Sequence, residues 1–549
     1  MDATFSISGQ YIDLFSRKIF PARINIVQGV IASIEPLEYA PDQYILPGFV
    51  DAHVHIESSM LVPSEFARLA LIHGTVATIS DPHEIANVCG KEGVEYMIDN
   101  SKQTALKIFF GAPSCVPATN FETAGAVLNA HDIDELLASK DIWYLAEMMN
   151  YPGVLTKDPE VMAKMAHAQK HGKPIDGHAP GVRGEAIQRY ATAGITTDHE
   201  SVSYEEALEK LQHGIKCLIR EGSAAKNFDA LIEIIRTHPD KIMFCSDDKH
   251  PDELVLHHIN LHVQRALSKG YDLFDVLRAA SVNPVLHYKI PVGLLRVGDP
   301  ADFIVVNDLE EFQVLKNYIN GRLVAAEGKC LLPSVNIPLL NHFHAALVTP
   351  DMFRVEAPKY HTRLQVMEAI DGQIVTGAGI YEILIQDGVV ISDVANDVLK
   401  IAVINRYTST PSPAVAFIRG FGLQKGAIAS TVAHDCHNII VVGVDDASMA
   451  AAVNHIIDAK GGISVAISPQ EVHCLPLPVA GLMTHEDGHQ TARQYSLLDK
   501  QAKKVLGSHL SAPFMTLSFM ALLVIPSLKL SDKGLFDGRK FTFTDPFVS

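Results

Sequence analysis

The chain changes its hydrophobic pattern near Leu46. Up to residue 44, short segments rich in β-branched residues alternate with Gly and Pro, which is typical of strands joined by turns. Beyond it, short apolar runs alternate with stretches that repeat apolar residues at helical spacing, such as 63–73 and 227–238. The runs are LPGFVDAHVHI (46–56), TVATISDPH (75–83), IFFGAPSCV (108–116), WYLAEMM (143–149), KPIDGHA (173–179), GITTDHES (194–201), IKCLIREGS (215–223) and KIMFCSD (241–247).

Eight apolar runs, each followed by a helical stretch, predict an α/β fold with a TIM (β/α)8 barrel. Polar residues stand at the C-terminal end of nearly every run, where barrel enzymes carry their active sites. A doubly wound sheet is the structural alternative, but no G-x-G-x-x-G follows the first run.

Outside the barrel the pattern predicts two further units. After a helix at 272–288, short strands with Gly and Asp turns return, as at the N-terminus. We therefore predict a discontinuous β-sandwich, a central TIM-barrel catalytic domain and a C-terminal α+β domain. Their boundaries are 1–47 with 290–345, 48–289, and 346–549, respectively.

Composition narrows the class of protein. The 549 residues are 48% apolar and 20% charged, which argues against a disordered chain, a collagen or a coiled coil. A net charge of −18 disfavours a nucleic-acid partner. Seven cysteines without a C-x-x-C pair argue against a disulfide framework and a zinc ribbon. The first residues do not resemble a signal peptide and no apolar run could cross a bilayer, so we expect a cytoplasmic protein with no membrane partner.

Histidine, with 26 copies, clusters at the predicted strand ends. His53 and His55 share one face of the first strand, because side chains two residues apart point the same way. Carboxylates and further imidazoles end four later runs: Glu147, His178, His199 and Asp247. Four imidazoles and two carboxylates suit a pair of Zn, Mn or Fe ions, which Glu147 can bridge. The alternative is that each residue is an ordinary polar group at the start of a loop, and Asp248 competes with Asp247 for the last position.

Several segments extend this pattern into a resemblance. They are PGFVDAHVHIESSM (47–60), ISDPHEIANV (79–88), GAPSCVPAT (111–119), AEMMNYPGV (146–154), DGHAPGV (176–182), TDHES (197–201) and CSDDKHPDEL (245–254). With them the chain resembles the amidohydrolase superfamily and, within it, the bacterial adenine deaminases. The last 200 residues or so resemble the C-terminal domain of that family. Many binuclear amidohydrolases bridge their metals with a carboxylated Lys on strand four, whereas Glu147 stands there in this chain.

The resemblance implies hydrolysis of adenine to hypoxanthine and ammonia, a step of purine salvage. It implies two divalent metal ions, with Mn favoured over Fe or Zn, and a small-molecule purine as the substrate. We expect a homo-oligomer. A metal-bridging hydroxide would attack C6 of the purine, and Asp247 would move the proton from water to the leaving amine.

Four other residues are second-tier candidates. Glu57 has the strand parity of His55, so it could protonate a ring nitrogen or orient a metal ligand. His83 and Glu84 stand at the end of the second run and are similar candidates, and His83 and Ser114 could contact the substrate. For Ser114, capping of a strand end is the alternative.

His434 and His437 could help to close the pocket from the C-terminal domain or simply hold a local turn.

Three other functions compete with a deaminase. A cyclic-amide hydrolase of the dihydroorotase or hydantoinase type would use nearly the same metals, and a catalytically inactive scaffold would have lost ligands. HEDGH (485–489) matches the zincin motif H-E-x-x-H, but Asp487 and Gly488 disfavour the continuous helix that zincin chemistry needs.

Overall fold

The computed structural model describes residues 4–359, 362–410 and 412–548. Its centre is a ring of eight parallel strands, in two hydrogen-bonded sheets that follow chain order. Thr196 N donates to Ile175 O (2.9 Å) and Asp247 N donates to His53 O (2.9 Å), which joins the two sheets on both sides. The TIM-like barrel is therefore present, as predicted. Its strands are β5 (Phe49–Val54), β6 (Thr75–Ser80), β7 (Lys107–Ala112), β8 (Ile142–Met148), β9 (Ile175–Gly177), β10 (Thr197–Asp198), β11 (Lys216–Arg220) and β12 (Ile242–Cys245).

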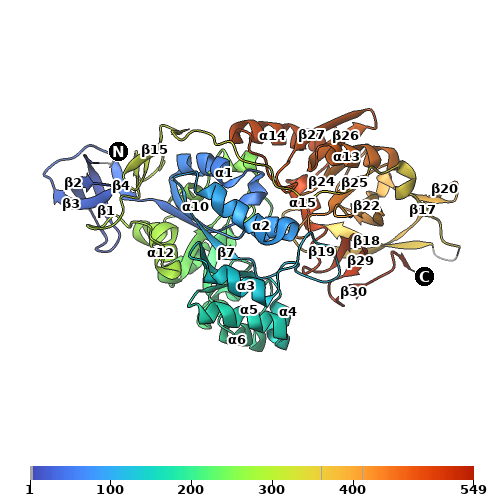
Figure 1. The fold of residues 1–549 in the computed structure, drawn as a ribbon, viewed down its shortest axis with the longest axis horizontal. Helices are drawn as coiled ribbons and strands as arrows, with labels where there is room; N and C mark the ends of the chain where they lie inside the picture. Colours follow the sequence, from blue (N-terminus) through green and yellow to red (C-terminus); the bar gives the residue numbers. More distant parts are fainter. Residues whose placement is uncertain (1–3, 360–361, 411, 549) are drawn as a thin grey trace.

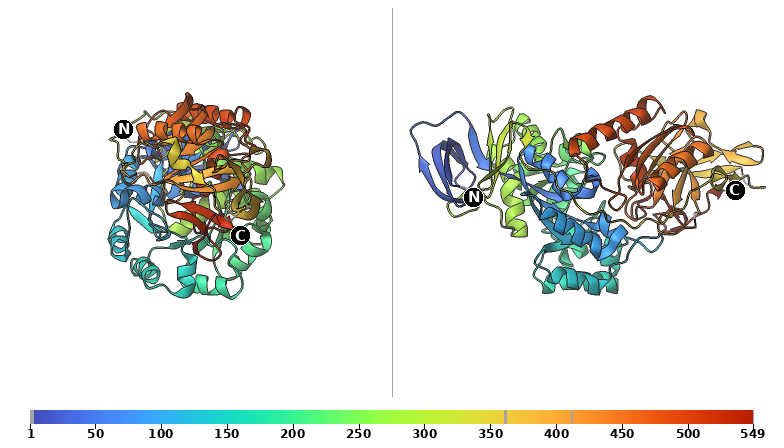
Figure 2. Two further views of the ribbon diagram at one scale, coloured as in Figure 1. Left: turned by 90° about the vertical axis from the view of Figure 1, so that its right-hand side faces the viewer. Right: turned by 45° about the horizontal axis from the view of Figure 1, so that its top comes forward.

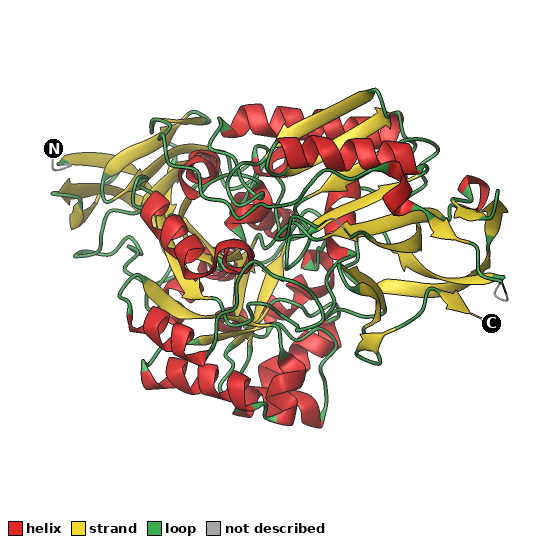
Figure 3. Ribbon diagram, turned by 45° about the vertical axis from the view of Figure 1, so that its right-hand side comes forward, coloured by secondary structure: helices red, strands yellow, loops and turns green. Residues whose placement is uncertain are grey.

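Helices cover the outside of these strands (Figure 3). The predicted helix at 272–288 is present as two α-helical segments with a π-helical turn at Arg278–Val282 between them. The helices are α1 (Pro63–Ala70), α2 (His83–Ser101), α3 (Ala130–Ala138), α4 (Tyr151–Thr156), α5 (Pro159–Lys170), α6 (Glu185–Thr192), α7 (Tyr204–Gln212), α8 (Phe228–Leu231), α9 (Pro251–Leu254), α10 (Ile259–Ser268), α11 (Leu273–Leu277) and α12 (Asn283–Tyr288).

One eight-stranded sheet combines the N-terminal segment with the segment that follows the barrel, in the order β16-β15-β14-β13-β4-β1-β2-β3. The two segments also pack on each other: Phe5 stacks on Tyr318 with ring centroids 5.4 Å apart. The buried core of this sheet includes Ile24, Ile45 and Phe303. The strands are β1 (Phe5–Asp13), β2 (Lys18–Val27), β3 (Val30–Pro36), β4 (Tyr44–Pro47), β13 (Phe303–Val306), β14 (Val314–Ile319), β15 (Arg322–Ala326) and β16 (Lys329–Cys330).

The C-terminal part is built on a nine-stranded sheet at the other end of the molecule (Figures 1 and 2). Strand alternation buries both of its faces: Ala402 and Ile404 pack with α13, whereas Ile401 and Val403 belong to the core shared with the barrel. Its helices are α13 (Asp446–Asp458), α14 (Gly488–Lys504) and α15 (Pro513–Phe519). The strands of this part are β17 (Val355–Glu356), β18 (Arg363–Ala369), β19 (Thr376–Glu382), β20 (Leu384–Gln386), β21 (Val389–Ile391), β22 (Leu399–Ile404), β23 (Ala414–Arg419), β24 (Ala427–Ser430), β25 (Ile439–Gly443), β26 (Gly462–Ser468), β27 (Glu471–Pro476), β28 (Leu528–Ser531), β29 (Gly534–Asp537), β30 (Thr542–Phe543) and β31 (Phe547–Val548).

The HEDGH motif is divided by a helix start. Asp487 is the N-cap of α14, and its carboxylate accepts a hydrogen bond from Gln490 N (3.1 Å). His485 therefore precedes the helix and His489 lies inside it, so the two imidazoles do not share a helical face as zincin chemistry requires. Among the described residues, no helix has the length and apolar character needed to cross a membrane.

Candidate active site

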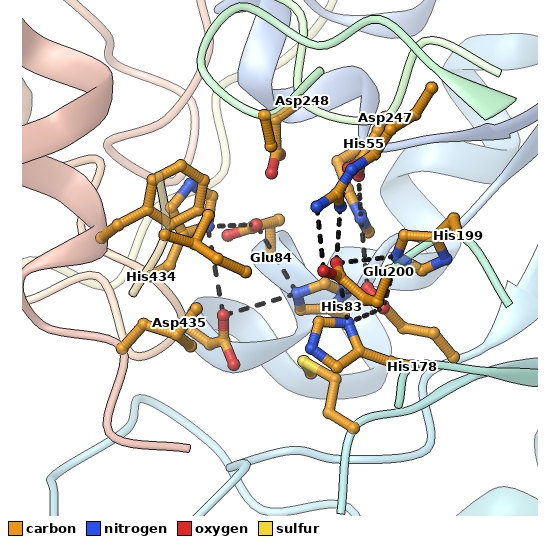
Figure 4. A pocket seen from close by; sticks show the side chains of 17 residues that line it. His55, His83, Glu84, His178, His199, Glu200, Asp247, Asp248, His434 and Asp435 are labelled. Atoms are coloured by element: carbon orange, nitrogen blue, oxygen red, sulfur yellow. Dashed lines mark hydrogen bonds and ion pairs between the residues drawn. The ribbon is translucent and has the colours of Figure 1, made fainter. Parts of the chain in front are cut away.

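The candidate site lies in a pocket at the C-terminal ends of the barrel strands, between the barrel and the C-terminal domain (Figure 4). His53 and His55 come from the end of β5, and their Nε2 atoms are 3.1 Å apart. Asp247 follows β12, with only Ser246 between them. Its Oδ1 lies 3.7 Å from His53 Nε2 and 3.4 Å from His55 Nε2. All three side chains are buried. The first and last strands of the ring thus bring their predicted ligands together.

Glu147, at the end of β8, lies between two pairs of histidines. Its Oε1 is 3.1 Å from His55 Nε2 and 3.9 Å from His53 Nε2. Its Oε2 is 2.7 Å from His178 Nδ1 and 3.2 Å from His199 Nε2. The two oxygens of one carboxylate therefore face different imidazole pairs, which is the arrangement that a bridging ligand of two cations requires.

The neighbouring imidazoles keep the Glu147 carboxylate ionised. Burial would raise the pKa of Glu147, but His178 and His199 outweigh it and hold this pKa well below its ordinary value. The Nε2 atom of His178 is buried and has no hydrogen-bond partner among the described residues. Imidazole nitrogens and carboxylate oxygens thus converge in a buried space, and at least one of these nitrogens is free to bind a ligand. This set of donor atoms fits divalent metal ions.

Arg220 and Glu200 complete the site, and neither was predicted. Arg220, the last residue of β11, donates through Nη1 to Asp247 Oδ2 (2.6 Å) and through Nη2 to Glu200 Oε2 (2.8 Å). Burial would raise the pKa of Asp247, but Arg220 and His55 hold it well below its ordinary value. Arg220 directly follows the apolar part of the seventh run (215–223), much as the predicted ligands follow the apolar parts of theirs, so a signal for it was present in the sequence.

His83 and Glu84 lie where β6 leads into α2, and both line the pocket. His83 Nδ1 is 3.3 Å from Asp81 Oδ2 and 3.7 Å from Glu147 Oε1. Glu84 faces the C-terminal domain, where its Oε1 is 2.6 Å from His434 Nδ1 and its Oε2 pairs with His437 Nε2. The His83 position is thus consistent with a substrate contact.

The two C-terminal histidines reach the site in different ways. His434 lines the pocket, and its ring stacks on Phe519 with centroids 4.8 Å apart. His437 is fully buried behind Glu84, and its Nδ1 accepts a hydrogen bond from Ala433 N (3.2 Å). In the neutral ring the proton must then sit on Nε2, so His437 donates to Glu84 rather than binding a metal. These histidines hold Glu84 as a carboxylate, consistent with its lowered pKa, although burial alone would raise it.

Glu57 and Ser114 are not among the residues that line the pocket, although both contact residues beside it. Glu57 Oε1 accepts a hydrogen bond from Ile85 N (3.2 Å) in the first turn of α2, and burial raises the pKa of Glu57 to about 7. Ser114 Oγ donates to Glu147 O (2.5 Å) and borders a separate surface cavity. Strand parity with His55 suggested Glu57, and a position near the end of the third run suggested Ser114. In the structure the chain turns after β5, so that the Glu57 carboxylate contacts α2.

Asp248 also lines the pocket. Asp247 has a positive φ of 56°, so the chain turns there and does not continue as a strand. Asp248 Oδ1 accepts a hydrogen bond from Ser58 Oγ (2.6 Å), and Asp248 is separate from the group formed by His53, His55 and Asp247. The geometry therefore favours Asp247 as the ligand.

Comparisons with known proteins agree with this geometry. The amidohydrolase family matches residues 44–324, and the adenine deaminase C-terminal domain matches residues 373–542. The adenine deaminase of Sulfurovum sp. (strain NBC37-1) is 57% identical over 98% of this chain and 99% of its own length. That of Salinibacter ruber is 56% identical over the full length of both chains. This chain belongs to the adenine deaminase family.

Membership of the adenine deaminase family accounts for both halves of the site. The amidohydrolase match covers the strands that carry the predicted metal ligands, and the C-terminal match covers His434 and Phe519. An adenine deaminase of Methanosarcina barkeri is 50% identical over 98% of this chain and 99% of its own length, so this similarity also spans both halves. The full-length relationship favours a deaminase over a cyclic-amide hydrolase.

Proposed function

We propose that this chain hydrolyses adenine to hypoxanthine and ammonia. Full-length similarity to adenine deaminases supports the reaction. One observation of the geometry carries the mechanism: Glu147 directs one oxygen to His53 and His55 and the other to His178 and His199.

The proposed cofactor is a pair of divalent metal ions, with Mn favoured and Fe or Zn as alternatives. The ligands would be the six predicted residues: His53, His55, Glu147, His178, His199 and Asp247. When bound, two such ions lower the pKa of a water molecule and stabilise negative charge that develops on the substrate. The negative charges of Glu147 and Asp247 offset part of the repulsion between two cations.

In the proposed reaction a C6–O bond forms between adenine and water, and the C6–N6 bond breaks. Asp247 takes one proton from the water and delivers it to the departing amine, which leaves as ammonia. The second proton of the water ends on ring nitrogen N1 of hypoxanthine. Arg220 orients Asp247 by holding Oδ2, so that Oδ1 faces the imidazoles. His83 lines the same pocket and is our candidate for a substrate contact.

We also propose that the chain is divided into three domains. A discontinuous β-sandwich of residues 1–47 and 290–345 is supported by the shared sheet and by the stacking of Phe5 on Tyr318. A barrel domain of residues 48–289 and a C-terminal α+β domain of residues 346–549 would then form the pocket between them.

The test is an assay for ammonia and hypoxanthine with the purified, Mn-loaded protein. We expect stoichiometric release of both products from adenine and no ring opening of hydantoin or dihydroorotate. Ring opening of a cyclic amide without release of ammonia from adenine would contradict the proposal.

A further inference from the structure

One carboxylate in the pocket wall has an oxygen without a partner. Asp435 lies in the loop between β24 and β25 and is only 2% exposed. Its Oδ2 has no hydrogen-bond partner among the described residues, and its Oδ1 is 3.7 Å from His83 Nε2 and 4.0 Å from His434 Nδ1. Leaving a buried carboxylate oxygen without a donor is unfavourable, so the position favours a donor supplied by a ligand.

The other pocket carboxylates have partners from the protein. Arg220 holds Asp247, and Ser58 donates to Asp248. Glu84 is paired on both oxygens by His434 and His437. Among these carboxylates, Asp435 therefore has the most acceptor capacity left for a substrate.

Asp435 lies at the end of the pocket away from the metal ligands. The ring of His83 separates them: its Nδ1 faces Glu147 Oε1 (3.7 Å), whereas its Nε2 faces Asp435 Oδ1 (3.7 Å). Figure 4 shows Asp435 and His434 on the side opposite His199. Apolar side chains of the C-terminal domain line the same space: Ile374, Phe519 and Leu522. The pocket thus combines an apolar wall with one distal acceptor, which suits a flat heterocycle with a distal N–H.

Adenine has such an N–H group. Its C6 and exocyclic amine must lie beside Asp247 and Glu147 for hydrolysis, and its remaining N–H belongs to the imidazole ring on the far side of the bicycle. An ionised carboxylate only accepts hydrogen bonds, so it can bind this N–H but not a substituted nitrogen. We propose that Asp435 binds the imidazole N–H of the purine and thereby selects free bases over nucleosides, which carry a sugar on N9. This inference rests on the proposed function.

The test is Asp435→Ala in the Mn-loaded enzyme. Loss of a hydrogen bond to a charged acceptor should raise KM for adenine about 10- to 100-fold, with a smaller change in kcat. Asp435→Asn keeps an acceptor oxygen and should give an intermediate KM. The inhibition constants of hypoxanthine and 9-methylhypoxanthine provide a second measurement. The preference of the wild type for hypoxanthine should fall towards equality in Asp435→Ala, since 9-methylhypoxanthine lacks the imidazole N–H.

Glu122→Gln is the matched control. Glu122 is a buried carboxyl group near Asp435 and Cys436 of this loop. It accepts a hydrogen bond from Thr119 Oγ1 (3.2 Å) and is not among the residues that line the pocket. Its variant should keep the wild-type KM and inhibitor preference. A structural role of Asp435 would weaken both inhibitors equally, and an unchanged preference in Asp435→Ala and Asp435→Asn would overturn the inference. Failure of the wild type to release ammonia from adenine would instead refute the proposed function.

Discussion

At the scale of single residues, the site depends on buried charges held close together. Glu147, Asp247 and four histidines are all nearly inaccessible to water, where unpaired charges are costly. Arg220 and the imidazoles offset the negative charges of the two carboxylates. In each of these two carboxylates, the two oxygens have different partners. Substitutions that remove the charge and keep the shape should therefore reveal the separate roles of Glu147 and Asp247.

Glu147→Gln preserves the shape of the side chain and removes its charge from between two proposed cations. We expect metal content to fall and adenine turnover to drop by at least about 100-fold, because the repulsion between the ions is no longer offset. Elemental analysis and steady-state assays measure both effects. A Gln variant with two bound ions and normal turnover would show that Glu147 does not bridge.

Asp247→Asn and Asp248→Asn compare two neighbouring acids in one pocket. Proton transfer by a positioned carboxylate contributes about 10²–10⁴-fold, so Asp247→Asn should reduce kcat by at least that range at matched metal content. Asp248→Asn should have a milder effect, since Asp248 pairs with Ser58 and not with the metal ligands. A severe loss confined to Asp248→Asn would move the proton-transfer role one residue along the chain.

At the scale of elements, strands and loops from distant parts of the sequence build the apolar wall. β28 contributes Lys529, which is fully buried. Its Nζ donates to Ile374 O (2.7 Å) and Phe519 O (2.8 Å), the backbone of two residues that line the pocket. Burial lowers the pKa of Lys529 to about 7, so this wall is supported by an amine that is only partly charged near neutral pH.

Lys529→Met should change the pH dependence of stability. Between a folded-state pKa of about 7 and the ordinary value near 10.5, the unfolded chain binds a proton that the folded chain does not. Unfolding therefore becomes less favourable as pH rises through this window, and the stability contribution of Lys529 grows with pH. We expect the melting temperature of the wild type relative to Lys529→Met to increase between pH 7 and 10. A difference independent of pH would show that Lys529 stays charged; Lys533→Met, which alters an exposed neighbour, is the control.

At the scale of the whole molecule, one apolar core runs from the barrel into the C-terminal sheet. It includes Val54 and Ile79 of the barrel together with Ile401, Val442 and Phe514 of the C-terminal domain. The pocket lies within this continuous packing, so the C-terminal domain forms part of the site's wall. Metal ions bound by residues from five strand ends would tie opposite sides of the barrel to one another.

Removal of the metal ions should therefore affect both activity and global stability. Chelation is expected to abolish adenine turnover and lower the melting temperature, because a ligand that binds only the folded state stabilises it by about RT ln(1 + [L]/Kd). Re-addition of Mn should restore both. Full activity of protein shown by elemental analysis to be metal-free would refute a metal-dependent reaction.

The sequence by itself determined the barrel and predicted the six ligands that the proposal uses. This was possible because the signal is local: apolar runs define the strands, parity places His53 and His55 on one face, and parallel strands bring their C-terminal ends to one rim. The same logic reached Glu147, whose two-sided contact set agrees with the predicted bridge.

Only the tertiary structure decided how Glu84 meets His437, how Arg220 pairs with Asp247, and which carboxylate is left for the substrate. Glu84 and His437 are more than three hundred residues apart, and no periodicity within one segment encodes the face it presents to another. Glu57 shows the same limit, because its carboxylate accepts a hydrogen bond from Ile85 N in α2 and is not among the residues that line the pocket. Local pattern sets the elements, whereas packing between distant segments sets which of their polar groups meet.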